Sequence, residues 1–187
     1  MKILLASTPA TGHLNPLLAI GRFLIAEGHE VAFLSGSALR SPIERIGARF
    51  YPLPAGADFD LRDFATVAPE LKAIPPGLEW FRVAMERVFV DAIPGQHEGM
   101  RQVLQDFPAD IIVGDDMLFG VLPMLLGPRS KRPPIALCGT SFLHWRPPMA
   151  RRLLPVCRLR QRRRSATITQ RSIVSMTSAS IGRWLIG

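Results

Sequence analysis

Two side chains of this sequence form a possible acid–base pair, although about 100 positions separate them. His13 lies in a loop-like stretch that follows a short apolar run near the amino terminus. A histidine with an ordinary pKa of about 6.5 is partly neutral near pH 7, so it can accept a proton from a substrate. Such catalysis often needs a carboxylate on the other ring nitrogen, which fixes the tautomer and stabilises the imidazolium. Asp115 is the candidate for that carboxylate. The alternative is a loop histidine that only donates to nearby backbone.

Asp115 and Asp116 are adjacent, and the sequence predicts a different role for each. Asp116 stands immediately before an expected helix at 117–126, so it is predicted to cap that helix by accepting from unpaired backbone N–H groups. Asp115 leaves the preceding strand and is therefore the better partner for His13. Adjacent carboxylates could also attract Mg²⁺. No third carboxylate is evident at a strand end, so the prediction is that no metal is bound.

The elements that must position these residues alternate between short apolar runs and helical patterns. Continuous apolar runs predict strands that are covered on both faces. The run at 3–6 is of this kind, and further strands are expected at 31–34, 50–53 (a weaker one), 110–114 and 135–138. Asn15 and Pro16 are predicted to begin the first helix as N-cap and first-turn proline, and Gly28 to end it. A second, short helix is expected from Ser41 to Gly47.

Residues 54–109 interrupt this alternation. The stretch begins with prolines, glycines and aspartates, which is typical of a loop. A helix is then expected whose apolar face carries Leu78, Phe81, Met85, Val88, Phe89 and Ala92. Pro94 and Gly95 are predicted to break it, and a second helix places on one face Met100, Val103, Leu104 and Phe107. Four aromatic residues are expected in the core rather than in a pocket: Trp80, Phe81, Phe89 and Phe119.

The alternation predicts an α/β fold over residues 1–145, a single domain with one doubly wound, Rossmann-like parallel sheet. The expected strand order is 3-2-1-4-5, in which strands 1 and 4 are neighbours about 4.8 Å apart. Ligands bind such sheets beyond the carboxyl ends of the strands, where the order reverses, so His13 and Asp115 should face one crevice. Thr140 and Ser141 follow strand 5 on the same rim, where they could bind a polar ligand or simply form a turn.

The loop after the first strand does not match the glycine patterns of dinucleotide or nucleoside triphosphate sites. Gly12 is its only glycine, whereas those sites need several. A helix N-terminus still favours anions. Binding of a nicotinamide cofactor or ATP by this loop is nevertheless disfavoured.

The composition excludes several classes of protein. Apolar residues make up 48% of the 187 and charged residues 20%, which is unlike collagen, mucins or wholly disordered chains. The longest apolar runs are interrupted well before the roughly 20 residues that a membrane span needs. Cys138 and Cys157 form no disulfide framework and no metal-ligand spacing. We therefore expect a cytoplasmic protein that does not enter a membrane.

The net charge of +8 averages two different parts of the chain. Residues 1–145 hold 13 Lys and Arg against 15 Asp and Glu, whereas 146–187 hold 10 Arg and no acid, where about four acids would be expected. One hypothesis is that 146–187 is a tail translated from a shifted reading frame; reading the encoding DNA in its other two frames tests this. The alternative is a disordered basic arm. Such an arm could bind nucleic acid through phosphates, but it lacks interleaved stacking aromatics, so nucleic acid is a disfavoured partner.

The combined pattern resembles the N-terminal, acceptor half of nucleotide-sugar-dependent glycosyltransferases of the GT-B fold. It is similar to bacterial macrolide and antibiotic glycosyltransferases and to UDP-glycosyltransferases. The segments that carry the resemblance are 2–6, 12–16, 28–31 and 110–115. The resemblance covers about residues 1–145.

The resemblance implies an inverting transfer of a sugar from a nucleotide-diphosphate donor to a small-molecule hydroxyl acceptor, without a metal or another cofactor. His13 would be the general base and Asp115 would orient it, while Gly12, Asn15, Thr140 and Ser141 would contact substrate. Residues 54–109 would shape the acceptor pocket. In this family a second domain holds most of the donor, and nothing after residue 145 resembles it, so the chain alone is expected to be truncated and inactive. A non-catalytic α/β binding module remains the alternative.

Overall fold

Five parallel strands form one sheet in the order β3-β2-β1-β4-β5, as the sequence predicts. The computed structural model describes residues 1–140. The strands are β1 (Lys2–Ala6), β2 (Glu30–Ser35), β3 (Arg49–Pro52), β4 (Ile111–Asp115) and β5 (Ile135–Cys138). All four neighbouring pairs are parallel. The expected doubly wound, Rossmann-like α/β fold is therefore confirmed.

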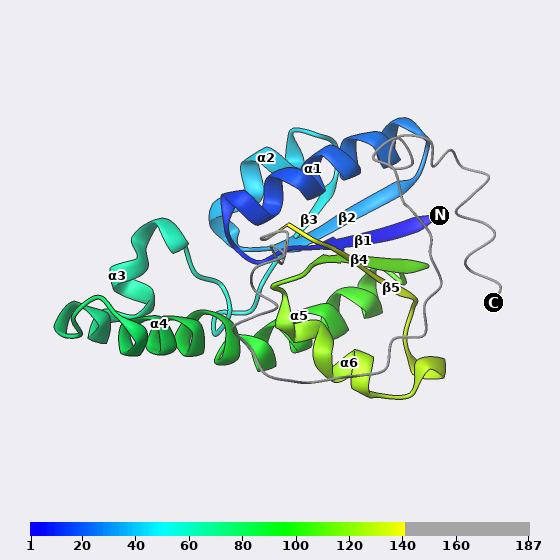
Figure 1. Cartoon of the computed structure of the whole chain (residues 1–187). Coiled ribbons are helices and arrows are strands. Elements are labelled where there is room, and N and C mark those ends of the chain that lie inside the picture. The colour runs from blue at the N-terminus through cyan, green and yellow to red at the C-terminus, as the bar shows by residue number, and fades with distance from the viewer. Residues whose placement is uncertain (141–187) are drawn as a thin grey trace, which may run out of the picture. The chain divides into compact units, whose positions relative to one another are not determined.

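Helices cover both faces of this sheet. The α-helices are α1 (Thr11–Ala26), α2 (Arg40–Glu44), α3 (Phe64–Val67), α4 (Leu78–Met85), α5 (Ile93–Asp106) and α6 (Leu122–Leu126). The 3₁₀ turns are η1 (Ser37–Leu39), η2 (Leu61–Asp63), η3 (Pro69–Ala73), η5 (Phe119–Val121) and η6 (Arg129–Lys131), and η4 (Glu86–Val90) is a π-helical turn. Figure 1 shows α1 and α2 on one face and α5 and α6 on the other.

The central strands are buried on both faces, which explains their continuous apolar runs. Leu4 of β1 packs in the layer that contains Met100 of α5. Leu5, the next residue, packs in the opposite layer with Phe33 of β2 and Leu17 of α1. All five side chains are fully buried. Because successive side chains of a strand point to opposite faces, both layers demand apolar residues.

Helix α1 begins five residues earlier than the sequence predicts. Its N-cap is Ala10, so Asn15 is not the cap and Pro16 lies inside the helix. Leu14 is buried and its N–H donates to the carbonyl of Ala10 over 2.9 Å. Burial of this extra turn against the sheet outweighs the local preference of Asn and Pro for a helix start. The end was predicted correctly, since Gly28 adopts a φ of 82° there, which favours glycine.

The apolar face expected over residues 78–92 is wrong at its beginning. Leu78 is 86% exposed and Phe81 is 57% exposed, so Phe81 is not a core residue. The buried residues of α4 are Val83 and Ala84, which form a small cluster with Leu71 of η3. Helix α4 therefore packs on its own neighbouring turn rather than on the sheet, and that partner decides which stripe is buried.

The expected break between two helices lies at residues 91–92, slightly earlier than predicted, and Pro94 and Gly95 belong to the first turn of α5. Pro94 occupies the first turn, where its missing N–H is not needed. A Cβ on Gly95 would lie 2.9 Å from the Cβ of Ala57, so glycine permits this close approach. Met100 and Val103 are buried, as the spacing predicts.

No helix within residues 1–140 is long and apolar enough to cross a bilayer. Ser141, Cys157 and the predicted tail at 146–187 lie outside the described residues.

Candidate active site

The site lies where β1 and β4 end side by side. Ala6 of β1 is paired with Gly114 of β4, so the next residues of both segments emerge at the same edge of the sheet. His13 stands in the first turn of α1, and its Nδ1 lies 3.0 Å from Oδ1 of Asp115. The structure thus brings together the two residues that the strand order predicted to face one crevice.

Asp115 is fully buried, and donors surround its carboxylate. Oδ2 accepts the backbone N–H of Thr8 over 2.6 Å, and Oδ1 accepts the Thr8 hydroxyl over 3.2 Å. Oδ1 also accepts the N–H of Met117 over 2.8 Å. These bonds hold the carboxylate in one orientation toward His13. Thr8 was missed by the sequence analysis; its only signal was a polar residue at the end of the first strand.

Thr140 completes the surroundings of the imidazole. Its Oγ1 lies 3.0 Å from Nδ1 of His13 and donates to Oδ1 of Asp116 over 3.0 Å. Since that hydroxyl proton is directed to Asp116, and a carboxylate only accepts, Nδ1 of His13 must carry the hydrogen. Nε2 then keeps its lone pair, and no residue within 1–140 hydrogen-bonds it. The ring is therefore oriented with its basic nitrogen available to a ligand.

The electrostatic surroundings favour the protonated form of His13. The hydrogen bond to Asp115 raises the pKa of His13 above 6.5, partial burial works in the opposite direction, and the charges of Asp115 and Asp116 add to the rise. The side chain is 20% exposed, so solvent reaches it, whereas that of Asp115 is inaccessible. A histidine in this position accepts a proton more readily than a free imidazole does.

Asp116 does not cap a helix, contrary to the prediction. The expected helix at 117–126 is shorter: η5 and α6 begin after the residues Leu118 and Val121. The physical reason is that Asp115 accepts the N–H two residues ahead, which makes a turn instead of a helix start. Asp116 instead accepts the N–H and hydroxyl of Thr140, each over 3.0 Å.

Two of the other residues predicted to contact substrate, Gly12 and Asn15, are exposed on α1. Gly12 is exposed beside His13, and a Cβ there would meet no atom within 4 Å. Asn15 is exposed in α1 two residues after His13, which is roughly 200° around a helix, so it lies on another face. Ser141 lies outside the described residues.

His13, Asp115 and Asp116 are the described residues whose ligand atoms could surround a metal ion, since these atoms lie within 4.8 Å of one another. A cation would need free oxygen lone pairs. Asp115 already accepts from Thr8, Met117 and His13, and its orientation is set by them. This donor set therefore fits an oriented histidine better than a metal ligand.

Comparison with known proteins identifies relatives of this chain. UDP-glucosyltransferase B1 of Starmerella bombicola is 34% identical over 135 residues, which are 70% of this chain and 31% of the relative. UDP-glycosyltransferase 2 of Phaeomoniella chlamydospora is 37% identical over 129 residues, 67% of this chain and 28% of the relative. The chain is a homologue of the UDP-glycosyltransferases. It spans about a third of the length of these relatives.

The structural neighbours of this UDP-glycosyltransferase homologue have the same fold. The glycosyltransferase of kitacinnamycin superposes with a TM-score of 0.55 at 21% identity, over 81% of this chain and 33% of the neighbour. The Rossmann-like sheet matches the GT-B architecture, and the coverage is consistent with an N-terminal half. No protein-family model matches the chain.

Proposed function

We propose that this chain is the acceptor-binding half of an inverting glycosyltransferase in which His13 is the general base. The contact that supports this most directly is the 3.0 Å hydrogen bond between Nδ1 of His13 and the buried carboxylate of Asp115. In the neutral form it places the ring hydrogen on Nδ1, so that Nε2 carries the lone pair that a base requires, and the side chain is 20% exposed. The homology to UDP-glycosyltransferases supports the reaction class.

In the proposed reaction, Nε2 of His13 takes the proton from an acceptor hydroxyl. The oxygen forms a bond to the anomeric carbon of a nucleotide-diphosphate sugar from the face opposite the leaving group. The bond from that carbon to the diphosphate oxygen breaks, and its electron pair leaves with the nucleotide. Asp115 stabilises the imidazolium that results, as in other His–carboxylate pairs. The nucleotide sugar is a co-substrate, and we assign no metal to the step.

Thr140 and Asp116 are proposed as positioning residues for the same imidazole. Thr140 accepts part of the Nδ1–H, and Asp116 orients the Thr140 hydroxyl. Substitution of Thr140 by Val keeps the shape and removes both bonds. We expect a lower rate of sugar transfer. We also expect a lower pKa for His13, because the Thr140 oxygen no longer accepts from the Nδ1–H of the imidazolium. A purely structural role of Thr140 would leave the pH profile of the reaction unchanged.

The chain alone is proposed to be truncated and to transfer little or no sugar, because it covers about 31% of the relative's length and would have one wall of the active cleft. Its partners would be a small hydroxyl acceptor and, with a donor-binding domain, a nucleotide sugar; nucleic acid is not proposed. We propose a cytoplasmic location, since the two cysteines form no disulfide framework.

The decisive experiment restores a donor half. Residues 1–140 are exchanged into the Starmerella relative in place of its matching segment, and UDP release from UDP-glucose is measured with a panel of hydroxyl acceptors. His13→Ala should lower acceptor-dependent release by about 10²–10⁴-fold. His29→Ala, which changes a histidine immediately before β2, should stay within about twofold of the parent. Equal rates for the parent and His13→Ala would leave the non-catalytic binding module as the better description.

A further inference from the structure

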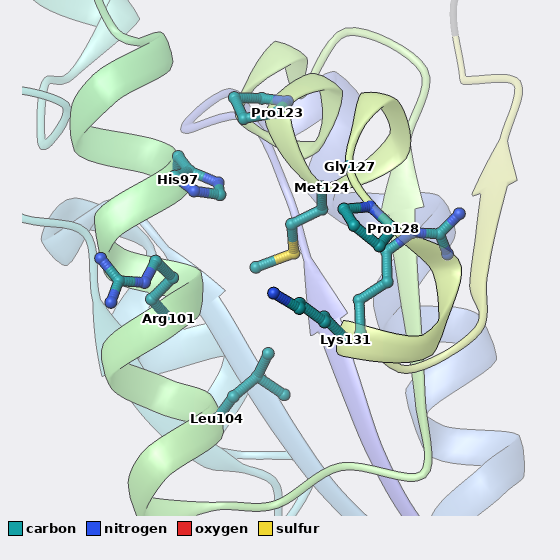
Figure 2. A pocket seen from close by; sticks show the side chains of 9 residues that line it. His97, Arg101, Leu104, Pro123, Met124, Gly127, Pro128 and Lys131 are labelled. Atoms are coloured by element: carbon teal, nitrogen blue, oxygen red, sulfur yellow. The ribbon is translucent and has the colours of Figure 1, made fainter.

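A concave site lies on the α5 face of the sheet, away from His13. It is a groove of about 300 Å³ between α5 and the segment that runs from α6 through η6 (Figure 2). Its lining residues are His97, Arg101, Leu104, Pro123, Met124, Gly127, Pro128, Lys131 and Arg132. None of these belongs to the His13 site.

The basic end of the groove lies toward the amino ends of β4 and β5, whereas His13 lies at their carboxyl ends. Lys131 and Arg132 precede β5, whose first residue pairs with Ile112 near the start of β4. The His13 site lies beyond the carboxyl end of the same strands, where Asp115 is paired with Cys138. The groove is therefore a separate surface feature.

The groove is positively charged and contains no acidic lining residue within the described chain. Lys131 and Arg132 form no ion pair with another described residue. The guanidinium of Arg101 points away from the middle of the groove in Figure 2, and it pairs with Glu98 over 3.2 Å. The ammonium of Lys131 extends inward instead.

Two buried nitrogen atoms of the lining have no hydrogen-bond partner within the described residues. They are Nε of Arg132 and Nδ1 of His97. The Arg132 N–H is an obligatory donor on a charged group, and leaving such a donor buried and unpaired is unfavourable. A carboxylate or phosphate oxygen is the acceptor that an arginine favours. The unpaired Nε–H of Arg132 therefore points to a bound oxyanion, whereas Nδ1 of His97 donates or accepts according to the tautomer.

Part of the lining is apolar. Leu104 and Met124 line the groove from its two walls, and the prolines 123 and 128 add two more apolar surfaces. We propose that this groove binds an amphiphilic oxyanion, a carboxylate or phosphate head group on a short apolar body. The head group contacts Lys131 and Arg132, and the body lies against Leu104 and Met124.

Calorimetric titration of the whole 187-residue chain tests this with octanoate and octyl phosphate. At least one of them should bind saturably at one site, and the tighter one identifies the head group. Octanol and inorganic phosphate each lack one half of the ligand and should bind at least tenfold more weakly. The proposal is overturned if octanol or inorganic phosphate binds as tightly as both amphiphiles. It is also overturned if neither amphiphile binds saturably.

Variants show where the ligand binds. Arg132→Gln should weaken binding of the tighter amphiphile by about tenfold. Lys131→Gln should weaken it by at least threefold. Arg129→Gln removes one positive charge from the same turn without changing the lining, so affinity should stay within twofold. The arginines of 146–187 are common to all these proteins and cancel in the comparison. An unchanged affinity in both lining variants, or an equal loss in Arg129→Gln, contradicts the assignment. Lys131 is exposed, so its variant tests the site even if Arg132→Gln does not fold.

Discussion

The substitution Asp115→Asn tests whether the buried carboxylate holds together the segments that follow β1 and β4. The wild-type side chain accepts from Thr8, Met117 and His13. Asparagine offers one carbonyl oxygen, and its NH₂ group only donates. Whichever way the amide is turned, a backbone N–H of either Thr8 or Met117 faces another donor.

The expected cost follows from that count. One buried N–H without an acceptor costs about 1–3 kcal/mol, and hydrogen bonds to a charged group contribute about 1.5–3 kcal/mol. We therefore expect the free energy of unfolding to fall by about 2–4 kcal/mol in Asp115→Asn, a large part of the stability of an ordinary domain. Urea unfolding followed by circular dichroism at pH 7 measures it.

Asp110→Asn provides a matched control at the other end of β4. Asp110 accepts the N–H of Lys2 over 2.7 Å at an exposed position, and an asparagine oxygen can keep that bond. We expect a loss below about 0.5 kcal/mol, as for most surface substitutions. If Asp115→Asn loses no more than this control, the carboxylate does not hold the segments after β1 and β4 together.

Three further predictions concern protonation and packing. Because the pKa of His13 is raised in the folded state, its contribution to stability is full below pH 6.5 and is lost as pH rises through the raised pKa. Urea titrations should therefore show that the difference in unfolding free energy between wild type and His13→Gln declines over that pH range. A difference that does not depend on pH contradicts this prediction. A Cβ on Gly120 would lie 2.3 Å from the Cβ of Gln96, so Gly120→Ala should lower the unfolding free energy by about 1–3 kcal/mol. Gly12 has open space around it, so Gly12→Ala should lower the unfolding free energy little or not at all. Equal effects of the two substitutions would show that η5 does not pack closely on α5. The chain has one tyrosine, and burial together with a hydrogen bond to Asp106 raises the pKa of Tyr51 to about 12; absorbance titration of Asp106→Asn should show a lower midpoint than wild type, and an unchanged midpoint excludes the contact.

Part of the site could be predicted from the sequence because it depends on topology. Continuous apolar runs at β1 and β4 identify strands that are covered on both faces, and alternation with helices makes the sheet parallel. In a parallel sheet, residues that leave neighbouring strands emerge at one edge. The pairing of His13 with Asp115 follows from this rule, although their chemical roles remain a proposal.

Other features could not be predicted, because they depend on partners distant in sequence. Asp116 has the residue type and position of a helix cap, yet it binds Thr140, 24 residues later. Phe81 fits a helical apolar face but is exposed, since α4 packs on η3 and not on the sheet. Local preferences of about 1 kcal/mol or less are outweighed by such contacts.

The sequence by itself determined which segments become strands, their order, and the edge at which the acid–base pair appears. Those properties follow from local hydrophobicity and from the few ways in which parallel strands can be connected. Only the tertiary structure decided which nitrogen of His13 is left without a partner among residues 1–140. It also decided that Thr8 holds Asp115, and that Arg132 and His97, which line one groove, have nitrogen atoms unpaired within the same range. Each of these depends on distances between side chains of separate elements, which no spacing along the chain encodes.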